Sequence, residues 1–340
     1  MTDTTALPPQ AQMMQFLTAK WVSPTLGVLA ELGVADALAD GPRTADDLAK
    51  QVKAHPRSLY RLLRAAASVG VFAEDDGGRF ALTPLADCLR SDVPGSMRGA
   101  VRLFNAEPMW APYGRLMHSA LTGEPAFDDL YGMDIYAYLA QNPAVEKVFL
   151  DTTVEFYASA APAIAAAYDF GRFGTVMDLG GGVGYLLASI LERSPSARGI
   201  LFERPSVLAQ AEPVVADRGL EARIELLEGD FFASVPATAD AYVIKSCVHN
   251  FRDDQALALL RVIRRATRPD TPLLIVDAVV PPGNGPHYSK FDDVEMLAVA
   301  GGIDRTEQEW RELVTAGGFE LRQIVECTPM AYLLEAWPVS

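Results

Sequence analysis

The chain has few cysteines, few basic residues and no long apolar run, and each of these scarcities excludes a class of protein. Its three cysteines, Cys88, Cys247 and Cys327, are odd in number and far apart, which argues against a disulfide framework and against a zinc site. Apolar stretches end well before the roughly 18–20 residues that a membrane-spanning helix needs. The net charge of −15 disfavours nucleic acid and anionic lipid as partners. The N-terminus has no basic start typical of a secretory signal, so the expected location is the cytoplasm.

The order of sequence patterns predicts a winged-helix segment at the N-terminus, followed by a larger catalytic part. With 340 residues, half of them hydrophobic, the chain can bury a large core and is expected to form more than one domain. Helical periodicity runs from residue 21 through HPRSLYRLLRAAASVG, and VFAEDDGGRFALTP then predicts a hairpin. The predicted boundaries are 1–92 for the winged helix, 93–170 for a helical linker that contributes to the substrate pocket, and 171–340 for the catalytic domain.

From residue 174 onward short apolar runs alternate with helical segments. The predicted strands are 175–180, 198–203, 223–230, 240–248 and 272–280, and the segments ELRQIVECT and AYLLEAWP predict a closing antiparallel hairpin. Strands that are apolar throughout and separated by helices indicate a parallel sheet covered on both faces. The fold class predicted here is therefore α/β, with a Rossmann-like, doubly wound, seven-stranded sheet.

The stretch MDLGGGVGYLL, residues 177–187, predicts a cofactor site at the first turn of that sheet. Its glycines form G-x-G-x-G, no Lys-Ser/Thr pair follows them, and Asp178 would repel a phosphate. Glu203 ends the second strand, where a carboxylate can accept the ribose hydroxyls. Asp230 can accept an adenine amino proton, and Phe231 can pack on the ring. These features predict an adenosine without phosphates, which S-adenosylmethionine provides and NAD and ATP do not.

Four motifs in order, MDLGGGVG, LEGDFF, VIKSCVHNFRDDQALALL and EMLAVAGGIDRTEQEWRELVTAGGFEL, give the chain a clear resemblance. From about residue 20 it resembles the class I S-adenosylmethionine-dependent O-methyltransferases of the plant caffeate and flavonoid type and their bacterial natural-product relatives. The resemblance implies that the helical N-terminal winged-helix region is a dimerisation domain, that the protein is a homodimer, and that S-adenosylhomocysteine is the product of the cofactor.

The resemblance also implies site residues. The cofactor set is Asp178, Gly180, Gly182, Glu203, Asp230, Phe231 and Lys245. His249 is implied as the general base, and its place after the fourth strand puts it at the cofactor edge of the sheet. Asp304 replaces the glutamate usual in the family's ERT motif, and Glu335 matches a second carboxylate beside the histidine. Either acid can be the main partner of His249.

The substrate pocket and the metal requirement complete the implied site. The family's layout suggests as pocket residues Phe149, Phe156, Tyr157, Met296, Asn105 and Trp110. No metal is expected, because a histidine base makes a metal clamp on two hydroxyls unnecessary. The expected substrate is a hydroxylated aromatic small molecule, such as a bacterial secondary metabolite.

Three other functions stay open from the sequence. The same scaffold serves C- or N-methylation and reactions without methyl transfer. A winged helix with basic side chains between residues 41 and 70 also allows a DNA-binding regulator, although a solvated helix surface is the favoured explanation of those charges. The main interpretation is O-methylation.

Overall fold

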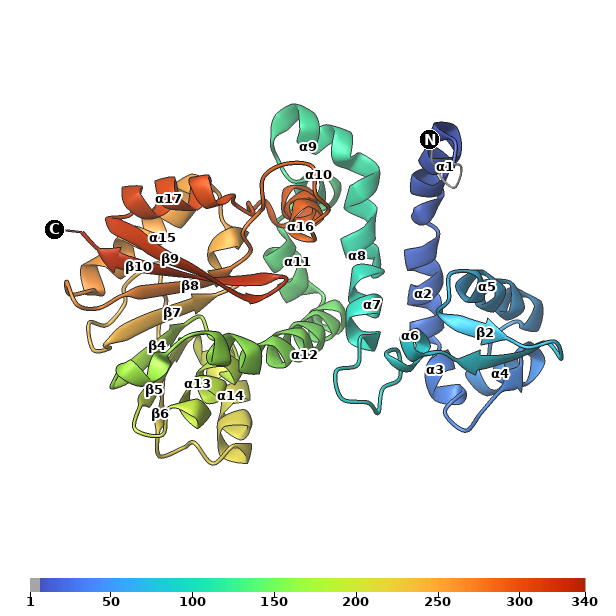
Figure 1. The fold of residues 1–340 in the computed structure, drawn as a ribbon, viewed down its shortest axis with the longest axis horizontal. Coiled ribbons are helices and arrows are strands. Elements are labelled where there is room, and N and C mark those ends of the chain that lie inside the picture. The colour runs from blue at the N-terminus through green and yellow to red at the C-terminus, as the bar shows by residue number, and fades with distance from the viewer. Residues whose placement is uncertain (1–6, 340) are drawn as a thin grey trace, which may run out of the picture. The chain divides into compact units, whose positions relative to one another are not determined.

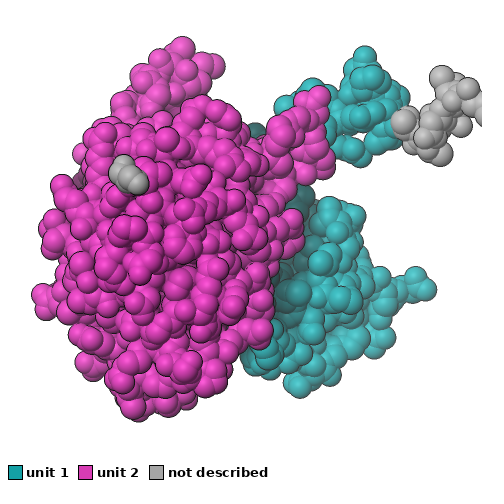
Figure 2. All heavy atoms as spheres, turned by 60° about the vertical axis from the view of Figure 1, so that its left-hand side comes forward, with its two compact units in different colours: residues 1–111, 142–156 teal, residues 112–141, 157–340 magenta. Residues whose placement is uncertain are grey.

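The computed structural model describes residues 7–339, apart from the side chains of residues 150, 151 and 153–157. By its internal contacts the chain divides into two compact units, residues 1–111 with 142–156 and residues 112–141 with 157–340 (Figure 2). One long helix, α12 (Pro143–Ala167), has residues in both. Among the described residues, no helix is both long and apolar enough to cross a membrane.

The first unit is mainly helical and carries a small sheet. Its helices are α1 (Pro9–Ala19), α2 (Val22–Glu31), α3 (Val34–Ala37), α4 (Ala45–Val52), α5 (Pro56–Ser68), α6 (Pro84–Asp87), α7 (Arg98–Phe104) and α8 (Glu107–Trp110). The hairpin predicted from VFAEDDGGRFALTP is present as β2 (Phe72–Glu74) and β3 (Arg79–Leu82). A third strand that the sequence analysis missed, β1 (Arg43–Thr44), pairs with β3. The next helix, α4, begins after Thr44, whose hydroxyl accepts the backbone N–H of Asp47 as an N-cap.

Helix α1 contributes nothing to the core of this unit. None of its residues is buried, and its apolar side chains are more than half exposed: Met13 58 %, Met14 55 %, Phe16 75 % and Leu17 58 %. Apolar surface of this kind is typical of a segment that docks on another molecule.

The second unit contains a seven-stranded sheet in the order β6-β5-β4-β7-β8-β10-β9 (Figure 1). The strands are β4 (Thr175–Leu179), β5 (Arg198–Glu203), β6 (Ile224–Glu228), β7 (Ala241–Lys245), β8 (Leu273–Asp277), β9 (Phe319–Thr328) and β10 (Ala331–Pro338). Strands β4 to β8 are parallel, whereas β10 is antiparallel to both β8 and β9. The predicted fold class is confirmed, including the antiparallel closing hairpin.

Helices cover both faces of this sheet. The covering helices are α13 (Tyr185–Arg193), α14 (Pro205–Asp217), α15 (Asp253–Ala266) and α17 (Glu307–Ala316). The second unit also contains the smaller helices α9 (Leu116–Thr122), α10 (Ala126–Tyr131), α11 (Ile135–Gln141) and α16 (Ser289–Glu295). Successive residues of β4 face opposite sides. Val176 packs in the core that includes α13 and α14, and Met177 packs in the core that includes α15 and α17.

The strand order fixes where a ligand binds. From β4 the chain builds β5 and β6 on one side and then returns to build β7 and β8 on the other. Doubly wound sheets bind their ligands outside the carboxyl ends of the strands, at this point of reversal. The glycine turn after β4 lies there.

Candidate active site

The glycine turn follows β4 directly. Gly180 and Gly182 have φ angles of +66° and +59°, a left-handed conformation that side chains with a Cβ rarely adopt. A Cβ on Gly180 would lie 2.8 Å from Cε1 of Phe231, whereas one on Gly182 would meet nothing within 4 Å. The turn therefore packs against the Phe231 ring at one glycine and leaves its backbone open at the other, as a cradle for a ligand requires.

The other predicted cofactor residues lie at the ends of the neighbouring strands. Glu203 ends β5, Asp230 follows β6, and Lys245 ends β7. The Glu203 carboxylate accepts the N–H of Arg204 at 2.7 Å, and Oδ1 of Asp230 accepts the N–H of Phe232 at 2.8 Å. The structure therefore brings these side chains to one sheet edge. Two acids, an aromatic ring and an open glycine turn fit an adenosine.

Asp178 is buried and Lys245 is half-buried at that same edge. Asp178 is 1 % exposed and lies under the glycine turn, since a Cβ on Gly181 would be 2.5 Å from its Cγ. Burial raises the pKa of Asp178 to about 7, although the positive charge of Lys245 acts to lower it. Burial lowers the pKa of Lys245 to about 8, although the negative charges of Asp178 and Asp277 act to raise it. The two groups stabilise each other's charged forms below the cofactor turn.

His249 lies in a short 3₁₀ turn, Val248–Asn250, that follows β7. Its Nδ1 is 2.9 Å from Oδ1 of Asp304, and its Nε2 is 3.9 Å from Oδ1 of Asp277. The backbone N–H of His249 donates to Oδ2 of Asp277 at 3.3 Å. Burial alone would lower the pKa of His249, but the charges of Asp277 and Asp304 and the hydrogen bond to Asp304 raise it to about 9.

The loop that carries Asp304 is fastened to the backbone of His249. The N–H of Ile303 donates to the carbonyl oxygen of His249 at 2.8 Å, and a Cβ on Gly302 would lie 2.0 Å from that oxygen. Arg305, 1 % exposed, donates to Oδ1 of Asp253 at 2.8 Å and to the carbonyl of Phe251 at 3.0 Å. These contacts fix the distance between the histidine and Asp304.

Glu335 does not lie beside His249, so that part of the sequence prediction is corrected. In β10 it is Tyr332 that pairs with Asp277, and Glu335 pairs with Leu274, further back along β8. The Glu335 carboxylate accepts hydrogen bonds from Arg172 at 2.8 Å and from Nε1 of Trp337 at 2.7 Å. It holds an ion pair on the sheet rather than the histidine.

Asp277 is the carboxylate that sequence reasoning missed. It is the last residue of β8, the strand next to β7, and it is 3 % exposed. The signal was present in the sequence: PLLIVDAVV is an apolar strand that ends in an acid, as MDLG is. Because parallel strands end at one edge, an acid there lies near whatever follows the next strand.

Asp292 of α16 extends this cluster. One ligand atom each from His249, Asp292 and Asp304 lie within 4.8 Å of one another, close enough to hold a cation. Burial and then the charge of Asp304 raise the pKa of Asp292 above its ordinary value. The two neighbouring carboxylates therefore disfavour each other's negative charge.

The predicted pocket residues divide between the two units. Phe149, Trp110 and Asn105 belong to the first unit and Met296 to the second, in a π-helical turn, Met296–Ala300. Asn105 is tied to its own unit, because Ser23 donates to its Oδ1 at 3.0 Å. The side chains of Phe156 and Tyr157 lie outside the described residues.

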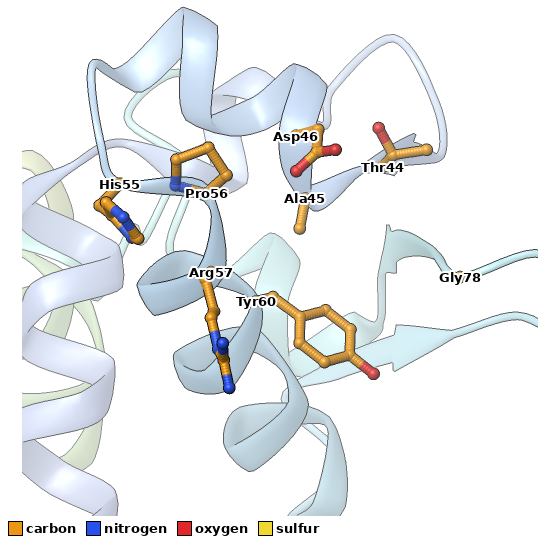
Figure 3. Close-up of a pocket in the computed structure, with 8 residues that line it drawn as sticks. All are labelled: Thr44, Ala45, Asp46, His55, Pro56, Arg57, Tyr60 and Gly78. Atoms are coloured by element: carbon orange, nitrogen blue, oxygen red, sulfur yellow. The ribbon is translucent and has the colours of Figure 1, made fainter.

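A shallow hollow of about 490 Å³ belongs to the first unit (Figure 3). It lies between the N-terminal ends of α4 and α5 and the β2–β3 turn, and its lining includes Thr44, His55, Arg57, Tyr60 and Gly78. None of the residues predicted for the cofactor or for catalysis lines it. This hollow is therefore separate from the candidate site.

Comparison with known proteins agrees with this geometry. Residues 113–320 match the model of the O-methyltransferase domain, and residues 14–92 match the O-methyltransferase dimerisation domain. The chain is 38 % identical to a phenazine O-methyltransferase of Lysobacter antibioticus over 334 residues, 98 % of each chain. It is 39 % identical over 300 residues to an 8-amino-8-demethylriboflavin N,N-dimethyltransferase of Streptomyces davaonensis, covering 87 % of this chain and 86 % of the other.

A solved structure also holds the cofactor product. The chain superimposes with a TM-score of 0.80, at 30 % identity, on an O-methyltransferase of neocarzinostatin biosynthesis in complex with S-adenosyl-L-homocysteine and 1,4-dihydroxy-2-naphthoic acid. The overlap covers 94 % of this chain and 96 % of that one. The chain thus belongs to the S-adenosylmethionine-dependent methyltransferase family defined by the O-methyltransferase and dimerisation domains, whose chemistry needs no metal.

Proposed function

We propose that the protein transfers a methyl group from S-adenosylmethionine to a hydroxyl of an aromatic small molecule, with His249 as general base. The single observation that carries the proposal is the half-buried His249, held by Asp304 at 2.9 Å beside Asp277 at the ligand edge of the sheet. When bound, the cofactor supplies a methyl group on a positively charged sulfur, which an electron-rich nucleophile displaces in line.

In this proposal the chain's own residues position the reactants and remove a proton. Glu203 accepts the ribose hydroxyls, Asp230 accepts the adenine amino group, and Phe231 packs on the ring. Asp304 orients the imidazole through Nδ1, which leaves Nε2 to take the proton of the acceptor hydroxyl. Asp277 stabilises the imidazolium that forms.

N-methylation is the second candidate, because one relative, 39 % identical, is named as an N,N-dimethyltransferase. An amine attacks as the neutral nucleophile and needs no base beforehand, whereas a phenol gains from one. Two buried carboxylates around His249 favour a base and hence the hydroxyl acceptor. C-methylation of a phenol and non-methylating chemistry remain lower alternatives.

The pH dependence of kcat/KM tests the role of His249. The base must be neutral, and its pKa is raised to about 9. We therefore expect kcat/KM to rise with pH, about tenfold per unit, and to level off near pH 9. Asp304→Asn removes a charge that raises this pKa, so the rising limb moves to lower pH. A profile that is flat in the wild type, or unmoved by Asp304→Asn, contradicts the proposal.

Cofactor binding tests the strand-edge acids. Asp230→Ala removes the acceptor proposed for adenine and frees the turn that its Oδ1 holds at Phe232. We expect affinity for S-adenosylmethionine, measured by calorimetry, to fall at least about tenfold. Asp217→Ala, at the exposed end of α14, is the matched control. Equal affinities for both variants would place the adenine elsewhere.

We further propose that the protein is a homodimer built through the domain of residues 14–92. Helix α1 has no buried residue and exposes Phe16 and Leu17. Light scattering should give twice the chain mass of 36.7 kDa. Phe16→Glu with Leu17→Glu should halve that mass, and Leu121→Glu, 78 % exposed and outside that domain, should not. A wild-type monomer contradicts the proposal.

The proposed location is the cytoplasm. The three cysteines are free, which suits that reducing compartment.

A further inference from the structure

Helix α16 carries two acidic side chains, and one of them, Asp292, lies close to His249. Asp292 and Glu295 are one helical turn apart and so share a face of the helix. Asp292 lies in the 4.8 Å group with His249 and Asp304, and the Tyr288 hydroxyl donates to its Oδ1 at 3.0 Å. The Tyr113 hydroxyl donates to Oε2 of Glu295. All these residues belong to the second unit.

The two tyrosines and the two acids face one space. Burial and then the charges of Glu295 and Asp292 raise the pKa of Tyr113. Burial and then the charges of Asp292, Asp304 and Glu295 raise the pKa of Tyr288. The tyrosine hydroxyls donate to the two carboxylates that share this face of α16, Tyr113 to Glu295 and Tyr288 to Asp292. Tyr113 is 38 % and Tyr288 44 % exposed, so both tyrosines reach the surface of the second unit.

The space has an excess of negative charge. Glu295 is 7 % exposed, and among the described residues its Oε1 is buried with no hydrogen-bond partner. The positive charge that stabilises the Asp292 carboxylate is that of His249, which also interacts with the carboxylates of Asp277 and Asp304. A buried carboxylate oxygen without a donor is costly. A ligand that brings donors or a positive charge would remove that cost.

We propose that Glu295 and Asp292, with Tyr113, form a subsite for a basic nitrogen on the methyl acceptor. The inference rests on the proposed function: the acceptor presents its hydroxyl to His249 and a protonated amine to α16. An ammonium carries three donors and a charge, which matches the free Oε1 of Glu295 and the neighbouring Asp292. The substrate class is thus an aromatic hydroxyl compound with a basic amine substituent.

Paired acceptors test the subsite without requiring turnover. The probes are hydroxynaphthalenes with an aminomethyl group, each matched to the same compound with a hydroxymethyl group. Calorimetry measures their binding with S-adenosylhomocysteine and EDTA present, so no methyl is transferred and no adventitious metal competes. At least one wild-type pair should show the amine binding ~10- to 100-fold tighter. Glu295→Gln should abolish that difference, and Glu326→Gln, an exposed site on β9, should keep it.

The outcomes separate this inference from the proposed function. Equal affinity across every wild-type pair, or a preference that survives in a Glu295→Gln protein with normal thermal melting, overturns the subsite. So does a fall in S-adenosylmethionine affinity relative to S-adenosylhomocysteine in Glu295→Gln, which would assign Glu295 to the cofactor's own charge. Methylation of hydroxynaphthalenes without an amine preference preserves the proposed function alone. Amine binding that depends on Glu295, without any hydroxyl methylation, preserves the subsite alone.

Discussion

Replacing His249 with alanine is expected to lower the rate of methyl transfer to a phenol by at least about 10²-fold, the usual scale for a general base. A phenol has a pKa near 10, so at pH 7 only about one molecule in a thousand is ionised, a handicap of roughly 4 kcal/mol. The carboxylates of Asp277 and Asp304 flank His249 at the ligand edge of the sheet. Without it the proton has no acceptor as the oxygen attacks.

Affinity for S-adenosylmethionine should stay unchanged in His249→Ala, because the residues proposed to bind it are those of the glycine turn and of β5 to β7. The matched control is His118→Ala, which should keep full activity. In the wild type, Nδ1 of His118 lies 3.7 Å from Oδ1 of Asp129. Stopped-flow or initial-rate measurements with saturating cofactor check the result. Loss of cofactor binding together with rate would make His249 a structural residue.

Adding a single methyl group at Gly302 is expected to have the next largest effect. A Cβ there would lie 2.0 Å from the carbonyl oxygen of His249, a backbone atom that also accepts the N–H of Ile303. The loop must move away, and Asp304 moves with it. Displacements of about 1 Å in a catalytic group can cost ~10²-fold in rate. Overpacking of this kind also costs about 1–3 kcal/mol of unfolding free energy.

Gly285→Ala is the control for Gly302→Ala. A Cβ on Gly285 would meet nothing within 4 Å, so both activity and melting temperature should match the wild type. For Gly302→Ala we expect a lower melting temperature and, in the folded fraction, a rate about 10²-fold below that of the wild type. Wild-type activity in Gly302→Ala would show that the distance between His249 and Asp304 does not matter.

The sequence predicts the sheet well because the parallel strands are mostly apolar and are followed by a glycine, an acid or a helix start. The same pattern correctly places Gly180, Glu203, Asp230 and Lys245 at one edge. The closing hairpin is also readable from its composition. Its position in the sheet is not, because nothing in AYLLEAWP says that β10 inserts between β8 and β9.

That insertion explains the error at Glu335. The register of β10 on β8 puts Tyr332 opposite Asp277 and leaves Glu335 at Leu274, where Arg172 binds it. Register depends on contacts between distant segments and cannot be read from spacing along the chain. Asp277 could have been found, since it ends a parallel strand. The approach of Asp292 could not, because it depends on how α16 packs.

The central claim is that His249 assists methyl transfer to oxygen, and one labelling experiment tests it most directly. The purified protein is incubated with S-adenosylmethionine carrying a ¹³C methyl group and with the hydroxynaphthalene panel, and NMR of the products locates the label. The account predicts label on a ring oxygen with the wild type and almost none with His249→Ala. Label on nitrogen or carbon instead, or equal oxygen labelling by His249→Ala, would contradict it.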